Sequence, residues 1–175
     1  MRHNATSQRA VSVTHLFKLC ESITIQAPIK RCFLLSTHLA VVQADLGMRP
    51  VRSSKSSRTE GLVLNNDIIR WQGWKFGLPQ FHESLIEAFD PPRFFRDRMI
   101  AGRFHSYEHD HAFKDLGNGA TRFTDELRFT MPFGRFGDLA GACILAPHIH
   151  HLMRHRFTRI KQIAESDLWQ QYLQP

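Results

Sequence analysis

Residues 94–134 decide the fold, and they read FFRDRMIAGRFHSYEHDHAFKDLGNGATRFTDELRFTMPFG. Residues that suit a buried face alternate with polar ones on both sides of the turn at 117–119, which is the period of a β-strand. Two such runs joined by a glycine-rich turn predict a β-hairpin. The hairpin carries His109, His111 and Asp125 at positions that share one face, so ionisable groups are expected where a ligand can meet them.

The position of the turn predicts which residues of the hairpin lie opposite each other. A turn centred on Gly117 gives three cross-strand pairs, namely His109 with Asp125, His111 with Phe123, and Tyr107 with Leu127. Phe113 and Thr121 belong to the same face, and its large apolar members indicate that it is the inner one. The facing depends on the register, because a slip by one residue turns every side chain to the other side.

The rest of the chain predicts an antiparallel meander with helices at both ends. Alternating segments predict strands at 15–25, 67–76, 80–89, 93–100, 103–113 and 120–131. Pro28 suits the first turn of a short helix, a second helix is predicted over 38–46, and 49–66 should form a long loop or a weak edge strand. An apolar stripe at helical spacing predicts a helix from about 136 to about 166, with a kink or break at Pro147.

Length and composition predict one domain. Of 175 residues, 42% are hydrophobic, which is enough for a core. We expect the domain to span 15–166, with a disordered tail at 1–14 and a C-terminal tail at 167–175. No apolar run reaches the roughly 20 residues of a membrane span. Three widely separated cysteines and the lack of a secretory signal predict reduced thiols in the cytoplasm.

The chain has a formal net charge of +7, which raises the possibility of an anionic partner. The basic residues are spread over the N-terminal tail, the 49–58 segment and the last helix, however, and form no compact cluster. A solvated basic surface is therefore the favoured interpretation. Association with nucleic acid is not expected, and binding to an anionic membrane through the basic loop and helix is the lesser alternative.

An ordered set of short motifs resembles the START-like superfamily, also called the SRPBCC or polyketide cyclase and lipid-binding group. The motifs are Phe76-Gly77, Pro91, Phe95-Asp97-Met99, Gly102, His109-His111-Phe113, Gly117-Gly119-Thr121, Asp125-Phe129 and Pro132-Gly134. Small bacterial members are similar, although Lys75 stands where a histidine is expected. The resemblance implies an α+β helix-grip fold, a curved sheet around a long C-terminal helix, with an internal hydrophobic pocket. It implies no single reaction.

Residues of the inner face and of the last helix are the candidates for contact with a ligand. They are Trp71, Phe95, Asp97, Met99, Tyr107, His109, His111, Phe113, Phe123, Asp125, Met153 and Phe157. His109 and Asp125 have three open interpretations: a structural polar pair, a pair that orients a ligand, or a general base with its orienting group. Two functions follow, namely binding of a hydrophobic small molecule, or a cyclase, dehydratase or hydrolase activity.

Two further groups of ionisable residues are candidate sites. His148, His151 and His155 lie on one side of the last helix, but the arginines around them favour a solvated face over a metal site. Glu83 and Glu87 share the face of Phe81, which is internal unless a bulge turns it outward. The sequence carries no P-loop and no dinucleotide-binding or zinc-finger motif, so it predicts neither a cofactor nor a metal.

Overall fold

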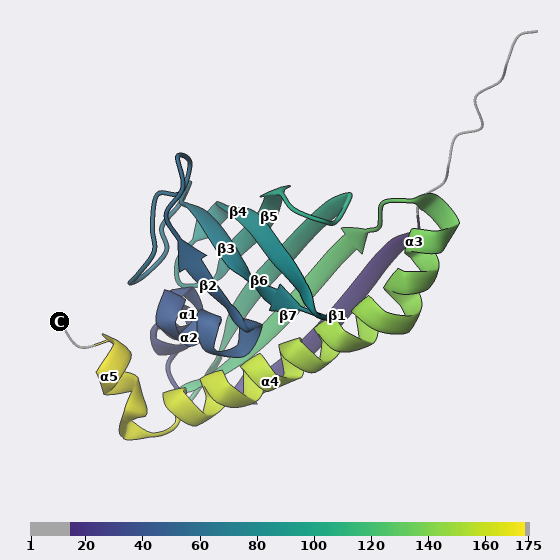
Figure 1. Ribbon diagram of the computed structural model, residues 1–175. Helices are drawn as coiled ribbons and strands as arrows, with labels where there is room; N and C mark the ends of the chain where they lie inside the picture. Colours follow the sequence, from purple (N-terminus) through teal and green to yellow (C-terminus); the bar gives the residue numbers. More distant parts are fainter. Residues whose placement is uncertain (1–14, 174–175) are drawn as a thin grey trace, which may run out of the picture.

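The computed structural model describes residues 15–173, and the tail predicted at 1–14 lies outside them. Its strands are β1 (Leu16–Ile25), β2 (Met48–Val51), β3 (Ile68–Lys75), β4 (Leu78–Asp90), β5 (Phe94–Ala101), β6 (Ser106–Gly117) and β7 (Ala120–Thr130). They form one antiparallel sheet in the order β1-β7-β6-β5-β4-β3-β2 (Figure 1). The predicted meander is confirmed, and β1 closes it beside the last strand.

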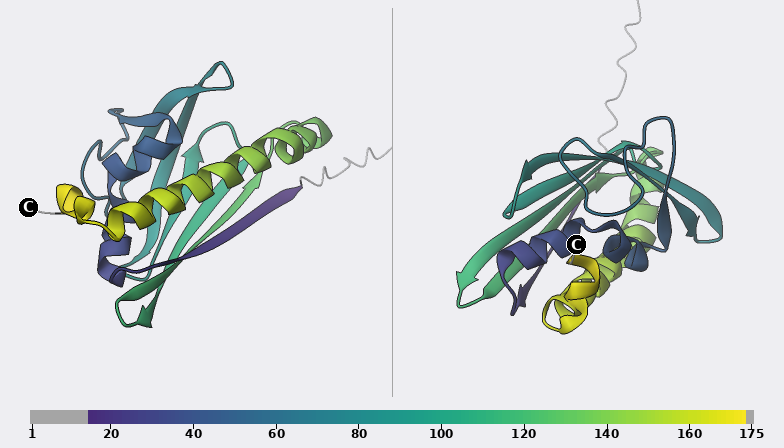
Figure 2. Two further views of the ribbon diagram at one scale, coloured as in Figure 1. Left: turned by 90° about the horizontal axis from the view of Figure 1, so that it is seen from below. Right: turned by 90° about the vertical axis from the view of Figure 1, so that its left-hand side faces the viewer.

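The helices are α1 (Ile29–Thr37), α2 (Leu39–Leu46), α3 (Gly134–Ala140), a π-helical turn (Gly141–Leu145), α4 (Ala146–Ala164), a 3-10 turn (Asp167–Trp169) and α5 (Gln170–Leu173). The sheet curves around α4, and α1 and α2 pack against α4 (Figure 2). Within the described range, no helix is long and apolar enough to cross a membrane. The predicted α+β architecture, a curved sheet holding a long C-terminal helix, is confirmed.

The β6–β7 hairpin has the predicted facing but a different register. Its turn is Asn118-Gly119, with φ of 52° and 76°, and a bulge lies between Asp115 and Gly117. A two-residue turn with both φ values positive matches the twist of the strands, and the bulge takes up one residue. His111 therefore pairs with Asp125, His109 with Leu127, and Tyr107 with Phe129. The predicted pairs were wrong by two positions. Because side chains alternate with a period of two, this shift leaves the same residues on the inner face.

The last helix changes its hydrogen-bonding pattern just before Pro147, as the sequence predicts. The π-helical turn at Gly141–Leu145 precedes the proline, which has no backbone N–H to donate to the previous turn. Gly141 lies where the helix touches β1, and a Cβ atom there would stand 2.7 Å from the Phe17 ring. Glycine is therefore required for the helix to lie this close to the sheet.

Residues 167–173, predicted as a tail, fold back onto the domain. The guanidinium of Arg31 lies 4.2 Å from the centre of the Trp169 ring, and the ring of Tyr172 meets His38 at 5.6 Å. The core beneath is aromatic, with Phe33 contacting Phe89, Phe95 and Phe113 edge to face. The C-terminal segment thus extends the packed surface of α1.

Ion pairs cover the outer face of the sheet. Glu83 and Glu87 pair with Arg70 at 2.8 Å and Arg98 at 3.0 Å on this face, beside two register shifts in β4. One register shift between β4 and β5 thus lies beside each glutamate, and both glutamates lie outside the cavity. The arginines hold them in place, so neither is available to a ligand on the inner face.

Candidate functional site

A cavity of about 1020 Å³ lies between the concave face of the sheet and α4. Its wall is largely apolar, with Trp71, Ile86 and Phe95 from the sheet and Met153 from α4. Ligand pockets in proteins range over about 300–1,000 Å³, so this cavity lies at the large end of the range. The aromatic side chains of the core leave it open, and a small molecule of substantial size fits inside.

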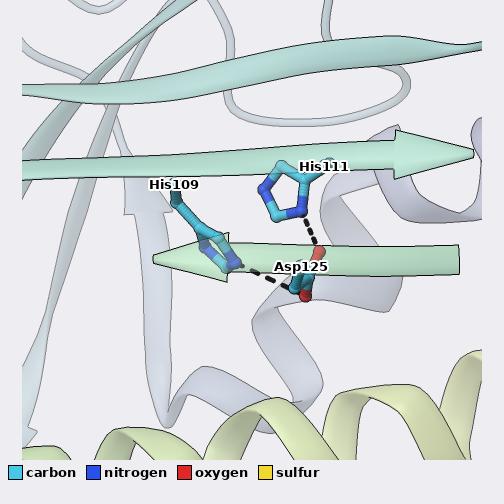
Figure 3. A group of neighbouring side chains, drawn as sticks. All are labelled: His109, His111 and Asp125. Carbon is cyan, nitrogen blue, oxygen red and sulfur yellow. Dashed lines mark hydrogen bonds and ion pairs between the residues drawn. The ribbon is translucent and has the colours of Figure 1, made fainter. Parts of the chain in front are cut away.

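A buried His-Asp-His group lies in the wall formed by β6 and β7 (Figure 3). Nδ1 of His111 lies 2.5 Å from Oδ1 of Asp125, and Nε2 of His109 lies 3.4 Å from Oδ2 of the same carboxylate. Residues two apart on a strand point to the same side, so both imidazoles approach Asp125 from β6. The side chain of Asp125 is 0% exposed, and the carboxylate is therefore the buried centre of the group.

Arg156 of α4 supplies the positive charge that this carboxylate needs. Its Nη1 lies 3.7 Å from Oδ2 of Asp125, and its Nη2 donates to the carbonyl of Ser36 at 3.2 Å. Burial alone raises the pKa of Asp125, but the charges of its basic neighbours together outweigh burial and hold that pKa well below its usual range. Asp125 is therefore ionised at neutral pH.

His111 is neutral at neutral pH, because burial, together with the charge of His109, lowers its pKa to about 3. A neutral imidazole carries one proton, and the contact of 2.5 Å between Nδ1 and the Asp125 carboxylate places it on Nδ1. Nε2 of His111 is then an acceptor. Nε2 of His109 has no hydrogen bond of normal length within residues 15–173. Both imidazoles thus line the cavity, and of their two contacts with Asp125 only the one from His111 has the length of a hydrogen bond.

A second polar set lies beside the first. Asp97 of β5 is the cross-strand neighbour of His109, and its Oδ1 is buried with no hydrogen-bond partner in the described structure. His82 and Tyr107 lie next to it with their rings 4.9 Å apart. Burial lowers the pKa of His82 and raises the pKa of Tyr107, so both are neutral at pH near 7. Asp97 is thus an acceptor without an ion-pair partner among the residues described.

His109, His111 and Asp125 also have the composition of a metal site. One ligand atom from each lies within 4.8 Å of the others, and two imidazoles with one carboxylate suit divalent transition metals. The guanidinium of Arg156, however, lies 3.7 Å from the carboxylate and 3.4 Å from Nδ1 of His111. The positively charged guanidinium occupies the position beside these ligand atoms that a metal cation would need. The residues therefore suit an ion pair better than a metal site. The predicted absence of a metal stays a prediction.

The structure divides the candidate residues into three groups. Those that line the cavity are Trp71, Phe95, Asp97, Tyr107, His109, His111 and Met153. Asp125 lies behind the two histidines and acts through them. Phe113, Phe123 and Phe157 stack on one another in the core, and Met99 packs against Gly102. These four belong to the support of the cavity and not to its lining.

Two residues of the site were missed from the sequence. The arginines around the histidines of the last helix were predicted to lie on a solvated face, yet one of them, Arg156, has a side chain that is only 12% exposed. The signal was present, because Arg156 follows Met153 by three positions and precedes Ile160 by four, on the apolar stripe. His82 carried no such signal, since it alternates with Phe81, whose face was the predicted inner one, and yet His82 lines the cavity.

The histidines of α4 do not act as one cluster. His148 lines the cavity and meets the ring of Phe76 at 5.0 Å, whereas His150 pairs with Glu21 of β1. His151 and His155 have ring centres 6.2 Å apart. The prediction of a plain solvated face was therefore incomplete, because one end of the row reaches the cavity.

The fold of this chain is similar to that of several solved structures. No family model and no curated protein matches the sequence. A START superfamily protein from Mycobacterium smegmatis superposes with a TM-score of 0.56 at 11% identity, covering 88% of this chain and 98% of that one. The Zhui aromatase/cyclase from Streptomyces sp. R1128 gives 0.60 at 14% identity, with 88% and 96% covered. Norcoclaurine synthase from Thalictrum flavum gives 0.61 at 10% identity, with 93% and 95% covered.

These matches span almost the whole of both chains but share few residues, so they establish the fold and leave the chemistry open. The likeness inferred from the order of the sequence motifs is confirmed at the level of the fold. The chain therefore has the helix-grip fold of the START-like superfamily.

Proposed function

We propose that the protein binds a small apolar or amphipathic molecule in the cavity between the sheet and α4. One observation carries the proposal: a largely apolar cavity of about 1020 Å³ has a few polar groups gathered on one wall. Sites of this composition bury the body of a ligand by the hydrophobic effect and fix its orientation through a few polar contacts. The fold of the structural neighbours, which include an aromatase/cyclase, supports the same class of ligand.

The polar wall suggests which end of the ligand is held there. Oδ1 of Asp97 is buried without a hydrogen-bond partner in the described structure, and Nε2 of His109 has only its 3.4 Å contact with Asp125. A buried polar atom left unpaired costs about 1–3 kcal/mol, and a ligand that supplies the missing partner recovers this cost. We therefore expect a lipid, polyketide or aromatic molecule with a hydroxyl or similar donor at one end, directed at Asp97 and His109.

Catalysis is the second candidate, favoured by the contact between His109 and Asp125. A histidine oriented by a carboxylate is the usual arrangement of a general base, and the cavity brings it to the substrate. His111 is poorly suited to the role, because a base with a pKa of about 3 has little tendency to take a proton near pH 7. An enzyme of the cyclase, dehydratase or hydrolase type would therefore use His109.

Binding is tested with a neutral fluorescent probe whose emission rises in apolar surroundings. We expect one probe per chain, displaced by long-chain alcohols. Met153→Trp, which fills the cavity from α4, should abolish the signal, whereas Leu168→Trp on the exposed 3-10 turn should leave it unchanged. A signal that survives Met153→Trp, or that is absent from the unchanged protein, would reject the cavity as the binding site.

The location of the protein is proposed on separate grounds. All three cysteines are free, with Cys32 buried and Cys20 and Cys143 exposed. Exposed thiols persist in a reducing compartment, which supports action in the cytoplasm.

A further inference from the structure

Exposed apolar side chains gather on two segments at one end of the molecule. Thirteen large apolar residues of the described chain are exposed, and eight of these belong to the β3–β4 hairpin or to α3 with its π-helical turn. They are Trp74, Phe76, Leu78, Phe81, Phe133, Phe136, Leu139 and Ile144. We call these eight residues the rim surface. Single exposed apolar residues are ordinary, but a concentration of this kind marks an interaction site.

Five residues of the rim surface are both exposed and part of the cavity wall, so they lie at an opening of the cavity. Phe76, Leu78 and Phe81 line the cavity from the hairpin, and Phe133 and Phe136 line it from α3. The ring of Phe76 also meets His148 of α4, which joins the hairpin to the helical side. A molecule that covers the rim surface therefore also covers the route into the cavity.

Two aromatic residues of the rim surface adopt a backbone conformation that bulky side chains rarely take. Phe76 has a φ of 53° and Phe133 a φ of 71°, both in the left-handed region. Neither gains burial in return, because Phe76 is 58% exposed and Phe133 is 86% exposed. The positive φ of Phe76 belongs to its two-residue hairpin turn with Gly77, as at Asn118-Gly119. Strained residues concentrate at functional sites, and the strain at Phe133 holds a phenyl ring toward solvent.

The charge around the rim surface is positive. Lys75 and Arg135 lie within its two segments, and Arg103 lines the cavity beside them. Asp138 is the single acidic residue of residues 74–81 and 133–144. Aromatic side chains together with lysine and arginine are the combination found where proteins meet the interface of an anionic lipid bilayer.

We propose that the rim surface docks on the face of an anionic lipid bilayer, with its aromatic side chains in the headgroup region and the cavity open toward the lipid. A second copy of the chain is the less suitable partner, because self-association would bring Lys75, Arg103 and Arg135 near their own copies. Docking does not depend on the proposed function. Only the exchange of a ligand between bilayer and cavity rests on that function.

The test is flotation of the full chain with two kinds of vesicle, phosphatidylcholine alone and phosphatidylcholine mixed with phosphatidylglycerol. The double variant Trp74→Ser and Leu139→Ser removes two apolar side chains that do not line the cavity. The matched control is Leu116→Ser with Leu168→Ser, at the β6–β7 turn and the 3-10 turn. The β6–β7 turn is at the opposite end of β7 from α3 (Figure 2).

We expect the unchanged protein to float with the anionic vesicles. The Trp74 and Leu139 variant should lower the partition coefficient at least about tenfold, because the burial of each large apolar side chain is lost. Arg135→Glu should lower it by about fivefold or more, because a charge near an anionic surface is removed and reversed. The control should bind as the unchanged protein does, and all variants should still bind the neutral probe in the absence of lipid.

Three results would overturn the proposal. One is no binding of the unchanged protein to anionic vesicles, and another is equal loss in the rim variant and the control. The third is a dimer in sedimentation velocity that the rim variant dissociates, which would assign the rim surface to a second copy of the chain. Probe binding in the cavity is read separately, so failure of docking leaves the proposed function standing and failure of the probe leaves docking standing.

Discussion

Replacement of Arg156 by methionine tests the electrostatic account of the buried site. Methionine keeps much of the length of the side chain but removes the charge that lies 3.7 Å from Oδ2 of Asp125. Loss of one partner from a buried ion pair costs about 3–5 kcal/mol, because the other charge stays buried without compensation. Here Asp125 still accepts the hydrogen bond from Nδ1–H of His111, so we expect a loss of about 2–3 kcal/mol in the free energy of unfolding at pH near 7.

The assay is urea unfolding followed by circular dichroism, with Arg154→Met as the control. Arg154 lies on the same helix and pairs with Glu21, but its side chain is 67% exposed, so its loss should cost under about 1 kcal/mol. The double variant Arg156→Met with Asp125→Asn should recover part of the stability, since no uncompensated charge remains.

The pH dependence gives a second reading of the same variant. The depressed pKa of Asp125 adds stability above the pKa of the unfolded state, near 4, and this stability is lost as the pH falls. Without Arg156 that pKa rises, so the gap in stability between the variant and the unchanged protein should narrow as the pH falls through the raised pKa of Asp125 in the variant. A loss equal to that of Arg154→Met, or a gap that does not change with pH, would refute the account.

Three other changes have expected outcomes. Gly141→Ala places a methyl group 2.7 Å from the Phe17 ring and should lower the free energy of unfolding by about 1–3 kcal/mol, measured by calorimetry. Adding Phe17→Leu to this variant should recover part of the loss. Because His111 has a folded pKa of about 3, below its unfolded value near 6.5, unfolding should cost about 2 kcal/mol less at pH of about 5 than at pH of about 7, and His111→Gln should flatten this slope in urea titrations. His109→Gln should weaken binding of a hydroxylated ligand by roughly 2- to 13-fold if His109 only orients it, and a fall of about 10²–10⁴ in turnover with binding retained would instead identify a general base.

The fold was predictable because its signals are local. The alternation of residues 106–117 and 120–130 defines two strands by itself, and the apolar stripe through Met153 and Ile160 defines the long helix. Glycine and proline place the breaks, with Gly47 closing α2 at a φ of 60° and Pro147 following the π-helical turn. These features depend on residues close together in the chain, so they can be predicted from the sequence alone.

The site was predictable in composition but not in pairing. His109, His111 and Asp125 were placed on the inner face, because facing depends only on odd or even position along a strand. The residues that pair with them across the strands were not predicted. A bulge beside Gly117 shifts the register of the hairpin, and the identity of the residues there does not indicate the bulge. Arg156 contacts Asp125 from α4, and only the packing of the helix on the sheet brings these two residues together.

Native mass spectrometry of the untagged protein from its own host will show whether the cavity holds a small molecule. We expect a bound lipid, polyketide or aromatic at one molecule per chain, released by denaturation and absent from the Met153→Trp variant. A protein that carries no ligand under gentle conditions, with the same mass before and after extraction and no uptake of added long-chain alcohols, would contradict this expectation.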